Sequence, residues 1–262
     1  MRKFKGKRAV AYFDVLGFKA KIKSQDLQTI VDQYENLIKN TDGQITFNDE
    51  SKAYYFKKVC YRYIFSDSIF LIANEDTEES FYEMLSYAWR MMQLSIAFGY
   101  PLRGAMVYGD VYVDTEKNIY VGESIVDAVS LEGAQDWIGA IVDNSVLERY
   151  STVFDDHDLG EMHSLILQEY DVPYKNGSLH KHTTINWRAN MNSHNGIKAL
   201  FKNESNNEAV KVKIDNTLQY CKHLRDIGMV YTDRESTPMQ YRYIFIGKES
   251  ELNDPHPVDD GY

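Results

Sequence analysis

The chain is poor in cysteine and has no long apolar run. Only Cys60 and Cys221 occur among its 262 residues, too few for a disulfide framework, so we expect both to be buried free thiols in a reducing compartment. No apolar run is long enough to cross a membrane. The basic start, residues 1–8, leads into a run that Asp14 interrupts and that lacks a small-residue cleavage site, which argues against a signal peptide. These absences predict a soluble cytoplasmic protein.

Positive charge is also scarce. The sequence has 29 Lys and Arg against 39 Asp and Glu, a formal net charge of -10, and such a surface repels nucleic acid phosphates. We therefore expect no nucleic acid partner. Small phosphorylated ligands remain compatible with the composition, because a few placed cations and metal ions can override the overall field.

The predicted elements follow a ferredoxin-like order. Hydrophobic patterning predicts a buried strand, a helix, a hairpin around Ser66 and Asp67, a helix, a strand–turn–strand around Gly109 and Asp110, a helix and a strand, over residues 9–16, 26–39, 58–74, 78–98, 102–114, 123–137 and 139–143. This β-α-β-β-α-β pattern indicates an α+β fold. We expect a core over residues 1–150.

A C-terminal α/β extension should follow the core. It would cover residues 151–246 and pack on the core, with a helix over 207–227 and strands over 182–187 and 240–247. The last residues, 247–262, are polar and acidic, so we expect a flexible tail.

Asp14 lies in an otherwise apolar strand. A buried carboxylate must be protonated, paired with a cation or bound to a metal ion, and a structural salt bridge is one alternative. In this strand order the first strand lies beside the hairpin, so Asp14 can meet Asp67 at the hairpin tip. Two such carboxylates form a hard-oxygen site for Mg²⁺ or Mn²⁺. The N–H groups of Gly17 and Phe18 would form a phosphate cradle beside it.

These residues resemble three motifs of the class III nucleotidyl cyclases. The family's F-x-D-I-x-G-F-[ST] is similar to "YFDVLGFK" at residues 12–19. Its K-x-x-G-D-[SC] is similar to "YIFSDS" at 63–68, and its R-x-G-I-x-x-G to "RGAMVYG" at 103–109, where Ala105 replaces the first glycine of that motif. The resemblance covers residues 8–145 and keeps the motif order.

The resemblance implies roles for the matched residues. Asp14 and Asp67 would bind two divalent metal ions, Mn²⁺ or Mg²⁺, assisted by the Val15 carbonyl. The backbone from Phe13 to Phe18, including Gly17, would hold the triphosphate. Arg103 would contact the β- and γ-phosphates, as a catalytic residue with Asp14 and Asp67; a solvated strand-end arginine is the alternative. A head-to-tail homodimer with sites at the interface is also implied.

Two departures from the family concern the substrate and the transition state. Tyr63 stands where the purine-reading residue is expected; a phenol suits a smaller ring, although a packed hairpin tyrosine is the alternative. The family's transition-state Asn and Arg are replaced by Val126 and Ser130. The candidate replacements are Arg103, Glu132 and Gln135, the last two more typical of capping or packing.

Both departures are similar to those of the pyrimidine cyclases of bacterial Pycsar antiphage defence, as is "DAVSLEGAQDWIG" at residues 127–139. This resemblance implies an enzyme that converts UTP to 3′,5′-cyclic UMP and pyrophosphate, with CTP as the alternative substrate. It also implies a separate effector protein that reads the cyclic nucleotide. A degenerate cyclase-fold module that only binds NTP and dimerises is the competing hypothesis.

Overall fold

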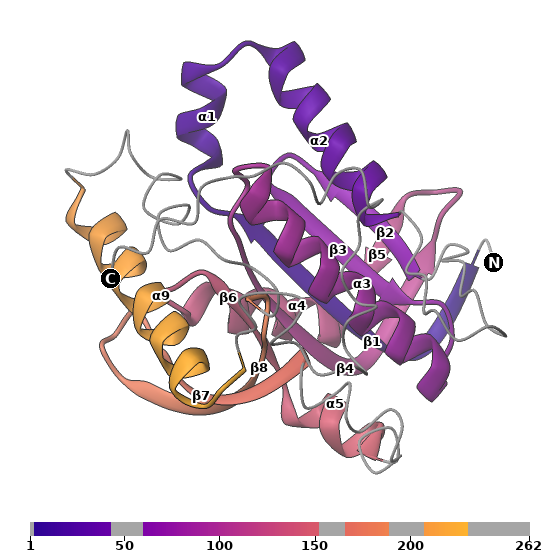
Figure 1. Ribbon diagram of the computed structural model, residues 1–262. Helices are drawn as coiled ribbons and strands as arrows, with labels where there is room; N and C mark the ends of the chain where they lie inside the picture. Colours follow the sequence, from indigo (N-terminus) through magenta and orange to yellow (C-terminus); the bar gives the residue numbers. More distant parts are fainter. Residues whose placement is uncertain (1–2, 43–59, 152–165, 189–206, 230–262) are drawn as a thin grey trace, which may run out of the picture.

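The computed structural model describes residues 3–42, 60–151, 166–188 and 207–229, and in this part of the chain it forms one eight-stranded sheet (Figure 1). The strand order is β2-β3-β1-β4-β6-β8-β7, with β5 beside β4. The strands are β1 (Lys3–Val15), β2 (Cys60–Phe65), β3 (Ser68–Ala73), β4 (Leu102–Asp114), β5 (Ile119–Val121), β6 (Gly139–Val142), β7 (Leu167–Pro173) and β8 (Leu179–Ile185).

The described residues form six helices, and most of these helices begin at a side-chain cap. The helices are α1 (Phe18–Ser24), α2 (Leu27–Thr41), α3 (Glu78–Ala97), α4 (Glu123–Ala134), α5 (Asn144–Arg149) and α9 (Glu208–Asp226). Asp26, Thr77 and Asn207 each place a side-chain oxygen on an early backbone N–H of the helix that follows, which satisfies a donor that has no acceptor within the helix.

Four strands give the sheet its ferredoxin-like centre. β4, β1, β3 and β2 are adjacent in that order, and each neighbouring pair is antiparallel. Together with the chain order β1-α-β2-β3-α3-β4, this confirms the predicted α+β class and element pattern. The hairpin predicted at Ser66 and Asp67 connects β2 to β3.

The central strand β1 divides its side chains between two faces. Ala9, Ala11 and Phe13 join the large core that includes the α3 side chains, while Val10 and Tyr12 join smaller clusters on the α4 side. Helices α3 and α4 therefore lie on opposite faces of the sheet (Figure 1). By the alternation of side chains along a strand, Asp14 belongs to the α4 side.

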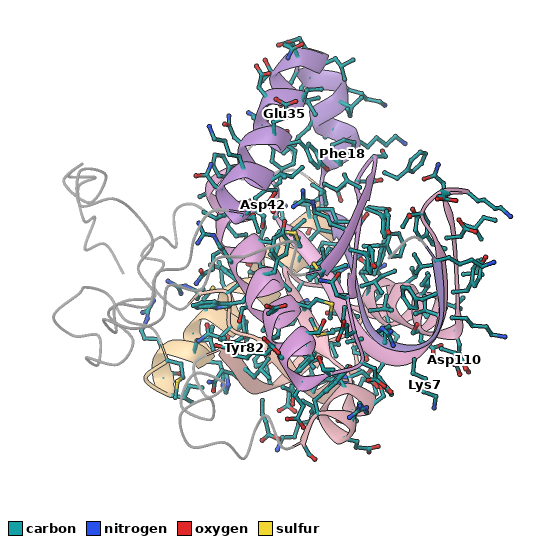
Figure 2. All side chains as sticks on the ribbon, turned by 90° about the vertical axis from the view of Figure 1, so that its right-hand side faces the viewer. Lys7, Phe18, Glu35, Asp42, Tyr82 and Asp110 are labelled. Carbon is teal, nitrogen blue, oxygen red and sulfur yellow. The ribbon has the colours of Figure 1, made fainter. Side chains whose placement is uncertain are left out.

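One predicted turn is wrong. Residues 102–114 form a single strand, because the β1–β4 ladder runs from Val15 opposite Leu102 to Lys3 opposite Asp114. Lys7 and Asp110 are paired where this ladder curls away from the rest of the sheet (Figure 2). The Gly-Asp pair suggested a turn, but pairing with the basic N-terminal half of β1 keeps it extended.

The C-terminal part continues the same sheet. β8 pairs with β6 at Ile141 opposite Thr184, and β7 pairs with β8. The expected helix over 207–227 is present as α9, the strand expected over 182–187 forms part of β8, and the helix expected to reach residue 137 ends at Ala134. The strand expected over 240–247 and the tail lie outside the described residues.

The two cysteines are free and buried, as expected. Of the helices that the structure describes, none is both long enough and apolar enough to span a bilayer.

Candidate functional site

Asp14 and Asp67 lie at the same end of the central strands. Asp14 is opposite Ser68 of β3 and opposite Arg103 of β4. The Val15 N–H donates to the Asp67 carbonyl oxygen over 2.9 Å, which fixes the hairpin tip against the end of β1. The structure therefore brings together the two acids, Val15 and Arg103, which the sequence predicted to share one site.

The surroundings of Asp14 disfavour its negative charge. Burial raises the pKa of Asp14 above its usual 3.8; Arg103 acts in the opposite direction, the charge of Asp67 raises it further and Lys175 lowers it. The effect of Asp67 shows that the two carboxylates repel each other. A divalent cation between them would relieve this repulsion.

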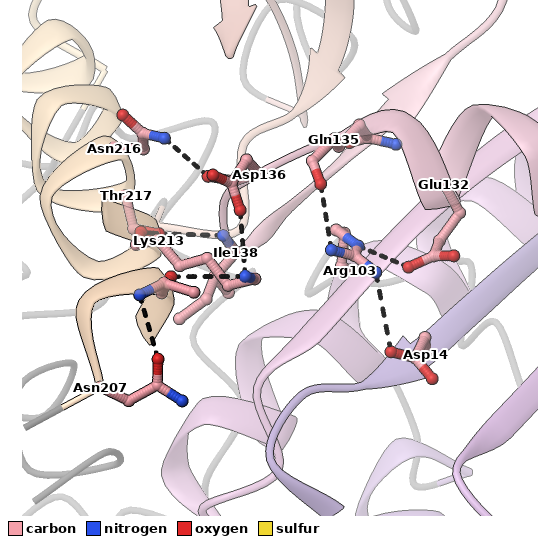
Figure 3. A network of polar contacts seen from close by, with 11 residues as sticks. Asp14, Arg103, Glu132, Gln135, Asp136, Ile138, Asn207, Lys213, Asn216 and Thr217 are labelled. Carbon is pink, nitrogen blue, oxygen red and sulfur yellow. Dashed lines mark hydrogen bonds and ion pairs between the residues drawn. The ribbon is translucent and has the colours of Figure 1, made fainter. Parts of the chain in front are cut away.

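Arg103 is turned into the protein. Its Nε lies 2.5 Å from Glu132 Oε1, and the two side chains are only 8% and 6% exposed. Its Nη1 donates to the Gln135 carbonyl oxygen over 3.0 Å, whereas its Nη2 is 3.9 Å from Asp14 Oδ2 (Figure 3). The main partner of Arg103 is thus Glu132, and the ion pair of Arg103 with Asp14, the structural salt bridge considered as an alternative, is the longer of the two.

The alternative of a solvated Arg103 at a strand end is wrong, because the side chain is buried. Glu132 and Gln135 are buried as well, and both contact Arg103. This placement agrees with a packing role for the two residues. Glu132 engages Arg103 through Nε and Gln135 through Nη1, so Nη2 is the guanidinium nitrogen left to contact a phosphate.

The loop after β1 turns at Gly17, where the sequence predicts a phosphate cradle. Gly17 has a φ of 76°, in the left-handed region that glycine tolerates, and α1 begins directly after it. The first N–H groups of a helix have no acceptor within it, so Phe18 presents such a group here. Phe13, by contrast, lies inside the ladder between Ile69 and Gly104 and is fully buried. Of residues 13–18, only Asp14 and Gly17 are partly exposed.

Tyr63 lies on the same sheet face as Asp14. It is opposite Phe70, which is opposite Tyr12, one step along the strands from Asp14. The Tyr63 and Tyr120 ring centroids are 4.0 Å apart. Burial, and then Tyr120, raise the pKa of Tyr63, and its hydroxyl is buried without a well-formed hydrogen bond to a described residue. The ring packs as a hairpin tyrosine does, and Tyr120 is the group that its hydroxyl faces.

Two contributors to the site could not be found in the sequence. The Tyr34 hydroxyl of α2 donates to the Ser66 carbonyl oxygen over 3.1 Å and so holds the hairpin tip. Lys175, in the turn between β7 and β8, donates its N–H to the Ala134 carbonyl oxygen over 2.9 Å, and its charge acts on Asp14 and Glu132. Both come from distant segments without a motif, so no local signal marks them.

The donor set suits a hard cation that also binds a substrate. Within the described ranges, no group of three or more His, Cys, Asp or Glu side chains is close enough to hold a metal ion. Mg²⁺ in nucleotide enzymes usually takes one or two protein carboxylates and completes its shell with phosphate oxygens and water. Asp14 and Asp67 match that arrangement.

The comparisons with known proteins identify similar folds only. No family model and no curated protein matches the chain. Similar solved structures include the catalytic core of a rhodopsin-guanylyl cyclase in complex with ATPalphaS (12% identity, TM-score 0.49, 71% of this chain and 98% of that one). The guanylate cyclase domain of RhGC from Catenaria anguillulae in complex with GTP (11%, 0.46, 71% and 98%) and the adenylyl cyclase CyaB from P. aeruginosa (11%, 0.44, 71% and 96%) are others. At such identities and TM-scores, function has to be argued from this chain's own residues.

Proposed function

We propose that the chain is a class III nucleotidyl cyclase of the pyrimidine branch, which converts UTP to 3′,5′-cyclic UMP and pyrophosphate. CTP is the alternative substrate. The observation that carries the proposal is that Asp14 and Asp67 meet at one end of the central strands, beside the turn at Gly17 and the buried Arg103. A carboxylate that is disfavoured by burial and by a second carboxylate has a clear use in binding cations.

The site would bind metal ions through its carboxylates and the triphosphate through its backbone. Asp14 and Asp67, with the Val15 carbonyl, would hold two Mn²⁺ or Mg²⁺ ions. Such ions would lower the pKa of the ribose 3′-hydroxyl and balance the triphosphate charge. The backbone at Gly17 and Phe18 would orient the β- and γ-phosphates for in-line attack.

Bond changes at the α-phosphorus define the reaction. The ribose 3′-oxygen forms a bond to that phosphorus and releases its proton to water, while the bond from the α-phosphorus to the α–β bridging oxygen breaks and pyrophosphate leaves with that electron pair. Arg103, held by Glu132 and the Gln135 carbonyl oxygen, would donate from Nη2 to a phosphate oxygen and so offset the charge that develops on the leaving group. Lys175 lies close enough to contribute a second positive charge.

The base would be read by Tyr63. Its buried hydroxyl interacts with Tyr120 without a hydrogen bond of good geometry, and a base would offer it a better acceptor. The space beside a phenol favours a single ring, which is why we propose a pyrimidine. The preference for UTP over CTP rests on the family resemblance alone.

A second candidate function is a catalytically degenerate dimer module that only binds NTP. The residues at the family's transition-state positions favour it. Val126 is exposed and aliphatic, and the Ser130 hydroxyl donates to the Val126 carbonyl oxygen over 2.8 Å within its own helix. Neither residue offers a group to a substrate.

The deciding experiment incubates purified protein with each of the four NTPs and Mn²⁺, and resolves the products by mass spectrometry. The proposal predicts cyclic UMP from UTP, and its loss in Asp14→Asn and Asp67→Asn. Asp110→Asn, at an exposed position on β4, is the matched control and should keep full activity. Cyclic AMP as the main product would overturn the role of Tyr63, and no product from any NTP would favour the binding module.

The biological setting is proposed by the same resemblance. We infer a cytoplasmic homodimer whose cyclic nucleotide acts as a second messenger in antiphage defence, read by a separate effector protein. A bacterial strain that carries the chain should accumulate the cyclic nucleotide on phage infection, and the Asp14→Asn strain should not.

A further inference from the structure

Polar side chains of helix α9 bind the connection between α4 and β6. Lys213 Nζ is 3.0 Å from Asp136 Oδ1, with the two side chains 20% and 15% exposed. One turn further on, Asn216 Nδ2 donates to the Asp136 carbonyl oxygen over 2.7 Å, and Thr217 Oγ1 accepts from the Ile138 N–H over 2.9 Å (Figure 3). Positions 213, 216 and 217 share one face of the helix, and all three side chains on this face contact residues 136–138.

The same connection holds Arg103 from its other side. Gln135, which precedes Asp136, is fully buried, and its carbonyl oxygen accepts from Arg103 Nη1. The Gln135 side chain donates to the Gly104 carbonyl oxygen over 2.9 Å and accepts from Trp137 Nε1 over 2.8 Å. Because every polar group of this side chain is engaged, a shift of the connection must move the acceptor that orients Arg103.

The β7–β8 hairpin adds a further restraint. The Asp136 N–H donates to the Pro173 carbonyl oxygen over 2.9 Å, and Gln135 forms a β-bridge with Tyr174. Asp136 thus has its amide, carbonyl and carboxylate each bound by a different residue of the C-terminal part. An apolar pair would fill the same space without the desolvation cost of a largely buried ion pair, but it would not fix the direction of the backbone.

We propose that Asp136 is a positioning residue for Arg103, and that Lys213 of α9 holds it in place. The C-terminal helix thereby sets the direction of the guanidinium next to Asp14 and Glu132. The effect on turnover rests on the proposed cyclase function, whereas the effect on Arg103 itself does not.

The direct test observes Arg103 in the full-length protein labelled with ¹⁵N-arginine. Its Nε–Hε NMR signal, assigned by its loss in Arg103→Lys, should shift in Lys213→Met and return toward the wild-type position in Lys213→Arg. Lys211→Met is the matched control, because Lys211 lies on the same helix and pairs with Glu208 in solvent. If Lys213→Met does not fold, the isosteric Asp136→Asn carries the same test.

Turnover supplies the second readout. In Lys213→Met, kcat should fall about tenfold while KM stays within about threefold, as expected when a group that acts in the transition state is displaced. A folded Lys213→Met protein with an unchanged Arg103 signal would overturn the proposal, and the Lys213–Asp136 pair would then have a purely structural role. A wild-type protein without any product would defeat the cyclase function, and the NMR signal would still decide the positioning role.

Discussion

At the scale of single residues, Asp14 combines burial with a neighbouring carboxylate. Its pKa is raised chiefly by burial and then by Asp67, against the opposing effect of Arg103. The folded state therefore binds a proton more readily than the unfolded state does. By linkage, this group lowers stability as pH rises from about its unfolded pKa through the raised folded pKa.

The first prediction follows from this loss of stability with rising pH. In EDTA, Asp14→Asn should melt at a higher temperature than the wild type, and the difference should grow as pH rises through this window. Asp26 is a control of opposite sign, because its hydrogen bonds with Thr29 lower its pKa. Asp26 therefore stabilises the folded protein at pH values above its unfolded pKa, and this stabilisation is lost as the pH falls through its folded pKa. A pH-independent difference for Asp14→Asn would contradict the electrostatic description.

The second prediction concerns Glu132. Removing one partner of a buried ion pair leaves the other charge uncompensated, so Glu132→Gln should lower the free energy of unfolding by about 3 kcal/mol. Lys181→Met, which breaks the exposed pair with Glu169, should cost at most about 1 kcal/mol. Urea denaturation measures both, and equal losses would show that Arg103 does not depend on Glu132.

The sequence predicted the members of the site better than their contacts. Asp14, Asp67 and Arg103 were marked by motifs and by strand order, and the structure places them together. The contact of Arg103 with Glu132 and the approach of Lys175 depend on side-chain directions and on a distant turn, which no spacing along the chain encodes.

At the scale of elements, the close contact between β1 and β4 depends on one glycine. A Cβ at Gly104 would lie 2.3 Å from Phe13 Cδ1 and 2.7 Å from the Tyr12 carbonyl oxygen. Such distances cannot be tolerated without moving the backbone or the buried ring. The strand pair that carries Asp14 and Arg103 therefore needs glycine at this position.

The third prediction compares two glycines. Gly104→Ala should destabilise the protein by about 1–3 kcal/mol through overpacking. Gly133→Ala, in α4 with open space around the added methyl group, should stabilise it by about 0.5–1 kcal/mol. Thermal and urea melts of both variants check the signs, and a neutral Gly104→Ala would show that the strands can separate freely.

Element boundaries were predicted where local chemistry decides them. The hairpin at Ser66 and Asp67 follows from its turn residues, and the helices expected over 26–39 and 78–98 are present as α2 and α3. Strand β4 was divided wrongly, because a Gly-Asp pair carries the same local signal in a turn and in a long ladder. Short elements such as α1 and β7 have too few residues for a clear period.

At the scale of the whole molecule, the described sheet exposes a large apolar side chain near each of its two edges. β2, at one end, exposes 83% of Phe65, and β8, near the other, exposes 65% of Leu179. Phe65 is opposite Ser68, which places it on the Asp14 side of the sheet. The proposed homodimer would cover Phe65 and not Leu179.

The fourth prediction tests that arrangement. Phe65→Glu should convert a dimer into a monomer and abolish product formation, because a charge buried in an apolar interface is strongly unfavourable. Leu179→Glu should leave both the mass and the activity unchanged. Light scattering coupled to size-exclusion chromatography gives the masses, and a wild-type monomer with full activity would contradict the shared site.

The continuous sheet could not be predicted from the sequence. An extension packed on a core was expected, but β8 and β7 extend the same ladder beyond β6, and α9 reaches back to residues 136–138. These contacts join residues that are 43 positions apart in the case of Ile141 and Thr184 and 79 to 80 positions apart in the case of α9. Hydrophobic patterning within a segment cannot predict such pairings. The boundaries at residues 150 and 246 remain predictions.

The central claim is that Asp14 and Asp67 share divalent cations beside a nucleotide. The most direct measurement is a Mn²⁺ titration followed by electron paramagnetic resonance, with and without a non-cleavable UTP analogue. We expect the analogue to tighten Mn²⁺ binding to the wild type, Asp14→Asn and Asp67→Asn each to abolish that effect, and Asp110→Asn to preserve it. Unchanged Mn²⁺ binding in both single variants would contradict the account.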